Sequence, residues 1–142
     1  MKRYDIIDHT ADVGIKGYGR TPEELFVHMA LGMFGLIADV TSIQPMASVP
    51  ILVQADDLEG LLVAWLKELL YAAERDHLFF MNCRVHQLIP DKPNLCLSGE
   101  ATGEAIDHDR HQVFREVKAV TYHELGIRRE GDLWVAQVIF DI

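Results

Sequence analysis

The segment from Leu133 to Phe140 constrains the fold more than any other part of the chain, because both of its alternating sets of side chains are largely apolar. A strand with one solvated face alternates apolar and polar residues, whereas a strand covered on both faces does not. We therefore expect a central strand with both faces covered. Leu125 to Arg129 precedes it across the turn Glu130-Gly131-Asp132, which predicts a hairpin.

Two segments have the three- and four-residue apolar spacing of amphipathic helices. The first is predicted to start after Thr21, the expected N-cap, and to run to about Ala38. The second follows Asp56 or Asp57, either of which can cap it, and continues through Leu70. One face of each helix is therefore expected to be buried.

The remaining elements are predicted to be strands or short connections. Alternation and turn signals favour strands over residues 13–18, 49–55, 78–89 and 95–104, and the last two form an antiparallel hairpin across the turn-rich residues 90–94. Residues 113–120 fit a short helix or a strand, and we favour a helical turn that enters a strand. The chain is thus predicted to be a single α+β domain, residues 1–142, with mostly antiparallel sheets and two main amphipathic helices.

Composition limits the class of function. The chain has 142 residues, 49% of them hydrophobic, with 22 acidic against 13 basic residues and a formal net charge of −9. Such a chain can bury a core, and its charge disfavours direct, tight nucleic-acid binding while suiting a cation or a basic protein partner. The charge also fits a role in solubility alone. The N-terminus has no signal-like apolar core and no segment reaches the ~20 apolar residues of a membrane span, which predicts a cytoplasmic protein without membrane contact.

Two further features contain residue types that are common in metal or redox sites. Cys83 and Cys96 each lie in an apolar, strand-like run and form no metal pair or redox motif, so we expect buried thiols. The loop Asp107-His108-Asp109-Arg110-His111 has the residue types of a metal site. Alternating charges on a solvated loop are the commoner explanation, and we favour it here.

Acidic residues are found at both ends of the chain. Asp8-His9-Thr10-Ala11-Asp12 holds two acids and an imidazole, and Asp141 is followed by Ile142 with its backbone and α-carboxylate oxygens. A carboxylate where a buried strand ends loses hydration unless it is paired, capped or bound to a cation. Hard cations such as Ca²⁺ or Mg²⁺ take such oxygens. The alternative is an ordinary solvated acid, or a salt bridge to Lys118 or Lys16.

Motifs spread over the whole chain resemble those of the archease family. They are Asp8-His9-Thr10-Ala11-Asp12, Gly19-x-Thr21-x-Glu23-Glu24, Met33-Phe34, Leu61-Leu62, Glu116-Val117-Lys118-Ala119-Val120-Thr121-Tyr122-His123 and Asp141-Ile142. The resemblance implies a small α+β accessory protein, not itself a ligase. It would assist the GTP-dependent RtcB-type RNA-splicing ligase in tRNA splicing or RNA repair. The implied role is to promote guanylylation of the ligase's active-site histidine and to allow multiple turnovers.

The resemblance also implies a divalent-cation site, for Ca²⁺ or Mg²⁺, made by Asp12, Asp141 and Ile142. Other residues within the motifs are candidates for supporting these ligands or for facing the partner, namely Asp8, His9, Lys118 and His123.

Each of these supporting residues also has an ordinary explanation. Asp8 fits a turn cap, His9 and His123 fit hydrogen-bonded histidines, and Lys118 fits a neutralising charge. One position departs from the family pattern: Arg20 stands where relatives often have an acid, so a contact made through that acid is in doubt.

Two other classes of function remain open from the sequence. In a metal-dependent hydrolase, Asp12 and Asp141 would bind metal and His9 or His123 would serve as the base. In a general chaperone or adaptor, the ion would be structural and the protein would bind several partners without regard to GTP.

Overall fold

The structure is a computed structural model, and it describes residues 1–8, 11–91 and 94–142. Its strands are β1 (Tyr4–Asp8), β2 (Asp12–Gly19), β3 (Ala47–Ala55), β4 (Leu78–Asp91), β5 (Asn94–Ala105), β6 (Ala119–Val120), β7 (Gly126–Glu130) and β8 (Leu133–Asp141). Its helices are α1 (Pro22–Ile37), α2 (Leu58–Asp76) and the short 3-10 helix η1 (Val40–Ser42). The predicted α+β class is confirmed.

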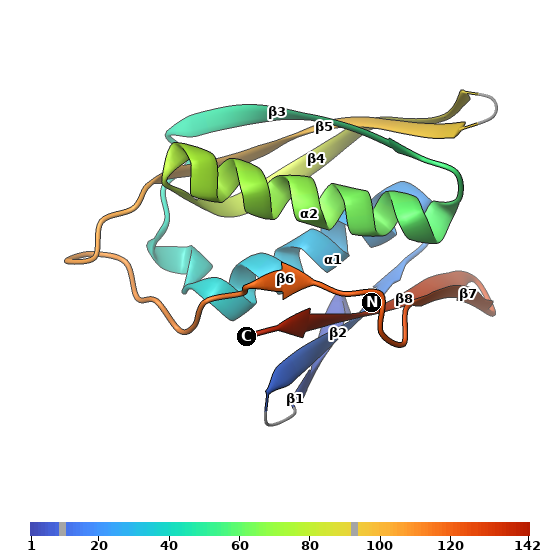
Figure 1. Cartoon of the computed structure of the whole chain (residues 1–142), viewed down its shortest axis with the longest axis horizontal. Helices are drawn as coiled ribbons and strands as arrows, with labels where there is room; N and C mark the ends of the chain where they lie inside the picture. Colours follow the sequence, from blue (N-terminus) through green and yellow to red (C-terminus); the bar gives the residue numbers. More distant parts are fainter. Residues whose placement is uncertain (9–10, 92–93) are drawn as a thin grey trace.

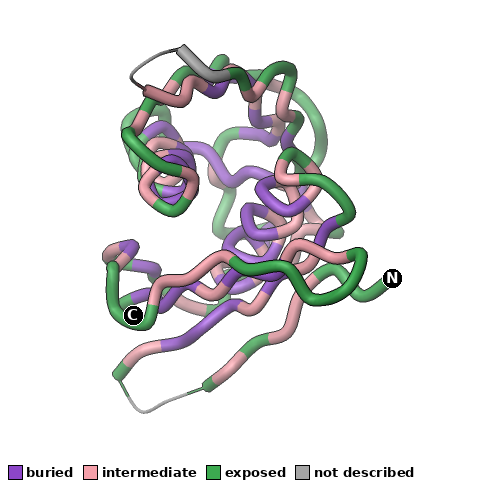
Figure 2. The backbone as a smooth tube through the Cα atoms, turned by 90° about the vertical axis from the view of Figure 1, so that its right-hand side faces the viewer, coloured by how far each residue is buried: buried purple, intermediate pink, exposed green. Residues whose placement is uncertain are grey.

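The strands form two antiparallel sheets, and the two long helices lie between them (Figure 1). One sheet has the order β1-β2-β8-β6, with β7 also paired to β8, and the other has the order β3-β5-β4. Helix α1 packs on β2 and β4, whereas α2 packs on β3 and β5. Burial concentrates on the helices and on the strand faces turned toward them (Figure 2).

Strand β8 occupies the central position that its apolar pattern predicts. It pairs with β2 on one side and with β6 and β7 on the other. Val138 and Phe140 are fully buried on the inner face of this strand, which α1 covers, and Val135 is fully buried on the opposite face. Strand β1 was not predicted, since it forms an edge and leaves residues such as Ile6 exposed.

Both helices start at the residues that their capping patterns predict. The Thr21 side chain accepts a hydrogen bond from the Glu24 N–H at 3.1 Å, and Asp57 accepts one from the Gly60 N–H at 2.7 Å. Helix α2 continues past Leu70 to Asp76, and its C-cap His77 has a left-handed φ of 55°. The two helices join in the core, where the Trp65 indole N–H donates to the Phe26 carbonyl at 3.0 Å.

The predicted helical turn at the start of residues 113–120 is wrong. These residues, all of them described, form no helix. Val113 makes an isolated bridge with Ala38, and Ala119–Val120 pairs with the end of β8. Main-chain pairing with Ala38 and β8 thus fixes the two ends of the segment, which local apolar spacing does not reveal.

Neither helix in the described part of the chain is long and apolar enough to cross a membrane. Cys83 is buried as predicted, while Cys96 is only partly buried, in the three-stranded sheet. Burial raises the pKa of the Cys83 thiol to about 12.

Candidate functional site

Asp12 and Asp141 come together although 129 positions of sequence separate them. The first residue of β2 is the cross-strand partner of the last residue of β8, and Ala119 of β6 pairs with Asp141 from the other side. Directly opposed residues on antiparallel strands point to the same face of the sheet. The two acids are therefore neighbours on one face.

That face is the outer one. Val13 and Phe140, the next pair along the two strands, are buried toward the helices, so alternation directs Asp12 and Asp141 away from the core. The backbone positions are well fixed, because the Lys118 N–H donates to the Asp141 carbonyl at 2.8 Å. The acids thus sit on a rigid sheet end and not on a loose terminus.

The Asp12 carboxylate has an unusual environment. Its Oδ1 atom is buried and has no hydrogen-bond partner among the residues that the structure describes. A buried carboxylate oxygen without a donor is costly, and nearly all such atoms in folded proteins are paired. The atom therefore fits a ligand to a cation, which would supply the missing positive charge.

Ile142 can contribute only main-chain oxygen to this site. Its side chain is partly buried and packs against the core. No group of three or more His, Cys, Asp or Glu side chains that could hold a metal occurs in residues 1–8, 11–91 and 94–142. The protein therefore offers two carboxylates and backbone oxygen at this point, a donor set that suits a hard cation completed by water or by a partner's groups.

The residues predicted to support the acid pair differ in how close to it they lie. Asp8 pairs with Val13 and so shares the face opposite to Asp12, while His9 lies outside the described residues. Lys118 is exposed beside Asp141, which its main chain contacts.

His123 lies away from the acids, beyond the other end of β6. Its side chain is 71% exposed, and its Nε2 atom is 3.9 Å from Glu124. Glu124 in turn accepts a hydrogen bond from Gln137 of β8 at 3.4 Å. The structure thus brings Lys118 to the acid pair but not His123.

Arg20, the departure from the family pattern, has a local structural role. Its main-chain N–H donates to the Glu24 carboxylate at 2.9 Å, one residue before the N-cap Thr21. Its backbone thus completes the capping arrangement of α1, and the side chain is exposed.

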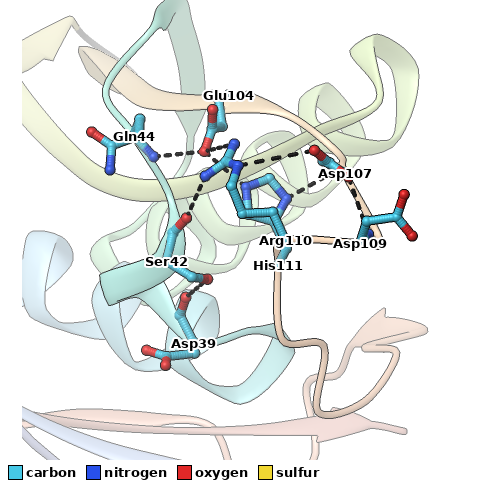
Figure 3. A network of polar contacts seen from close by, with 8 residues as sticks. All are labelled: Asp39, Ser42, Gln44, Glu104, Asp107, Asp109, Arg110 and His111. Carbon is cyan, nitrogen blue, oxygen red and sulfur yellow. Dashed lines mark hydrogen bonds and ion pairs between the residues drawn. The ribbon is translucent and has the colours of Figure 1, made fainter.

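A second polar cluster joins the mostly exposed loop 107–111 to Glu104, through the exposed Arg110 and the buried His111. Figure 3 shows residues from the η1 region, the end of β5 and the following loop converging on Glu104. The Glu104 Oε1 atom accepts from Arg110 Nη2 at 2.7 Å, from His111 Nε2 at 2.8 Å and from the Gln44 N–H at 2.8 Å. Asp107, His108, Asp109 and Arg110 are exposed, as the prediction of a solvated loop expects, whereas His111 is buried.

The hydrogen bonds of His111 define its protonation. The Asp107 N–H donates to Nδ1 at 3.0 Å, so this nitrogen must be an acceptor and the proton lies on Nε2, which donates to Glu104. Hydrogen bonds from Arg110, His111 and the Gln44 backbone lower the pKa of Glu104 to about 2. Glu104, Arg110 and His111 are thus paired with one another, which stabilises the loop.

Comparison with known proteins supports one family. A model of the Archease protein family matches residues 4–142. The protein archease of Methanosarcina barkeri is 40% identical over 141 residues, which are 99% of this chain and 97% of that protein. The protein archease of Pyrococcus furiosus is 40% identical over 143 residues and is covered completely, as is this chain.

Solved structures agree with these relatives. The solution structure of Protein 1598 from Methanobacterium thermoautotrophicum has a TM-score of 0.86 and 33% identity, with 100% of both chains covered. An archease from Thermotoga maritima, described as a possible chaperone, has a TM-score of 0.54 at 20% identity over 96% of this chain and 94% of that one, which shows the fold alone.

The fold and the site define a small α+β protein with paired carboxylates at the end of an antiparallel sheet. With a family model matched along nearly its whole length, the chain belongs to the archease family.

Proposed function

We propose that this protein is an accessory activator of an RtcB-type GTP-dependent RNA ligase in tRNA splicing or RNA repair. In this role it promotes guanylylation of the ligase and allows multiple turnovers. The observation that carries the proposal is the acid pair of Asp12 and Asp141, with one buried carboxylate oxygen left without a donor. Family membership supplies the class of partner.

The proposed cation is Ca²⁺ or Mg²⁺, held by Asp12, Asp141 and a main-chain oxygen of Ile142. All three donors are hard oxygens, which these ions prefer to the nitrogen and sulfur ligands of zinc. When bound, the ion would supply positive charge near nucleotide phosphate oxygens. The same residues act as a rigid acceptor set, because adjacent strands fix the two carboxylates on one face.

Charge supports a protein partner over direct contact with RNA. The chain has a formal net charge of −9. Such a surface repels a phosphate backbone and attracts a basic protein, and it speeds the encounter with an RNA-handling enzyme. The acid-bearing end of the sheet is therefore the proposed ligase-facing surface.

The hydrolase alternative loses one of its two candidate bases. His123 is highly exposed and contacts Glu124 and not the acid pair, whereas His9 lies outside the described residues. A general base must come within hydrogen-bond reach of the proton that it removes. A chaperone or adaptor role with a structural ion would show itself as binding that does not depend on GTP.

The test is RNA joined per mole of RtcB-type ligase from the same source, with GTP and a divalent metal. We expect the ligase alone to stop near one turnover and the added protein to carry it through many. Asp141→Ala should abolish this gain, while Asp132→Ala, an exposed acid in the β7–β8 turn, should not. Unchanged joining with the unmodified protein would contradict the accessory role.

A further inference from the structure

A cavity of about 380 Å³ lies in the layer between the two sheets. It is lined by α1, the last turns of α2, β4 and the segment 106–118. Its walls are mainly apolar. The residues that form them include Phe34, Leu69, Leu70, Ala73, Phe80 and Val117. An apolar cavity of about 150 Å³ is enough to hold a benzene molecule, so this one has room for a large apolar side chain or two smaller ones.

The outer wall of the cavity is held in place. Segment 106–118 is tied at one end by the Glu104 cluster, through Arg110 and His111. In its middle, Arg115 Nη1 donates to the Leu36 carbonyl at 2.7 Å, at the C-terminal end of α1. The wall cannot collapse onto the helices without breaking these bonds, so the cavity is preformed.

Apolar surface continues outside the mouth of the cavity. Val113, which lines it, is 43% exposed, and the adjacent Phe114 is 49% exposed. A small ligand that filled the cavity would leave this outer apolar surface uncovered. Apolar residues grouped around a mouth are typical of a surface that another protein covers.

Charge restricts the occupant. Glu74 and Glu116 are exposed, and neither has an ion-pair partner in the part of the chain that the structure describes. Arg115 and Lys118 line the same cavity with the opposite charge, so the lining by itself is balanced. The formal net charge of −9 on the chain as a whole therefore favours a partner segment with basic groups beside the apolar anchor.

Lys118 joins the cavity to the acid pair. This residue lines the cavity, and its main-chain N–H donates to the Asp141 carbonyl. The cavity lies on the helix side of the five-stranded sheet, and the acids lie on the outer side. A partner that crosses the sheet edge at Lys118 therefore reaches both.

We propose that this cavity is the anchor site for an apolar side chain of the protein partner, within a segment that carries basic residues next to the anchor. The proposal rests on the accessory function above. It assigns binding of the ligase and activation of the ligase to different residues. The cavity supplies affinity for the ligase, and the acid pair supplies activation.

The first test compares Ala73→Leu, which adds three carbons to the cavity, with Ala64→Leu. Ala64 is also half-buried on α2 but does not line the cavity. We expect the half-saturating concentration for ligase stimulation to rise at least about tenfold for Ala73→Leu, with the maximum unchanged, and to stay within about twofold for Ala64→Leu. Asp141→Ala should show the reverse, with normal ligase binding and a lost maximum.

A rim variant protects the test against an effect on folding. Val113→Ser removes exposed apolar surface and keeps the backbone bridge to Ala38, and its control is Leu52→Ser, on the distant β3, where the side chain is 70% exposed. We expect weaker ligase binding for Val113→Ser only. Equal binding by Val113→Ser and its control, or by Ala73→Leu and Ala64→Leu, would overturn the cavity proposal and leave the accessory role standing.

A direct probe is the uncharged apolar dye phenylnaphthylamine. We expect its fluorescence to rise with the unmodified protein and not with Ala73→Leu, and to fall when ligase is added. Dye that stays bound in the complex with ligase would overturn the proposal. A ligase that neither binds nor responds to the unmodified protein would overturn the accessory role and this occupant together.

Discussion

The acid pair and the Glu104 cluster are two concentrations of charge that the structure treats in opposite ways. Glu104 receives three hydrogen bonds, and the His111 side chain within the cluster is fully buried with both ring nitrogens engaged. Asp12 lies against another acid and keeps a buried oxygen with no partner in the described part of the chain. The first arrangement strengthens the fold, and the second weakens it unless something binds.

This difference separates structural from functional charge better than residue type does. The loop 107–111 contains more metal-ligand types than the end of β8, yet its Arg110 and His111 side chains are engaged by Glu104. The acid pair is sparse, yet the Asp12 Oδ1 atom has no partner among the described residues. An unsatisfied buried oxygen on a rigid strand is therefore the stronger sign of a binding site.

The largest effect on stability is expected from His111→Ala. The change removes both hydrogen bonds of the ring and its edge contact with Phe79, where the ring centroids are 5.4 Å apart. We expect the free energy of unfolding to fall by about 2–4 kcal/mol. Chemical denaturation measures it, with the half-exposed His86→Ala as the control.

The effect of His111→Ala on ligase stimulation also separates the Glu104 cluster from the acid pair. Per folded molecule, His111→Ala should keep the maximum of ligase stimulation, because the acid pair is unchanged. Unaltered stability would show that the Glu104 cluster is not structural.

The second largest effect on stability is expected from low pH, which should weaken the hydrogen bonds of Glu104. The pKa of Glu104 is about 2, below its ordinary value of 4.5, so the folded state favours the ionised form. The stability that this supplies is complete above pH 4.5 and is lost as the pH falls toward 2. Glu104→Gln should therefore flatten the pH dependence of unfolding over this range, and the exposed Glu23→Gln should not. Parallel curves for Glu104→Gln and the unmodified protein would contradict the assigned hydrogen bonds.

The smallest effect on stability is expected from Asp12→Asn without divalent metal. The change removes a charge but no hydrogen bond of Oδ1, so the free energy of unfolding should change by less than about 1 kcal/mol, in the stabilising direction. Thermal unfolding in a chelator measures it. A loss of several kcal/mol would mean that Asp12 has a structural partner after all, and the contrast with Glu104 would disappear.

Much of the fold was predictable because local signals agreed with tertiary packing. Thr21 and Asp57 cap helices as their neighbours indicate, and β8 is central because both of its faces are apolar. The errors arose where partners far along the chain decide. Residues 113–120 form no helix because Ala38 and the end of β8 pair with the two ends of the segment, and periodicity within eight residues contains no information on that.

The site was predictable in part and for a different reason. Asp12 and Asp141 were singled out by their position in motifs, and the register of β2 on β8 brings them together. Neither the buried state of the Asp12 oxygen nor the role of His111 has a local signal, because each depends on groups that other strands or loops supply. Which cation binds and which partner is served stay predictions.

The most direct test of the central claim is the change in the free energy of unfolding when Ca²⁺ or Mg²⁺ is added to the protein alone. If the acid pair is a cation site, the unmodified protein should gain about 1.4 kcal/mol at tenfold excess over the dissociation constant, and Asp12→Asn and Asp141→Asn should gain nothing. His111→Ala, although less stable, should gain as much as the unmodified protein. Equal gains in all four proteins, or no gain in any, would show that the unpaired oxygen of Asp12 does not mark a cation site.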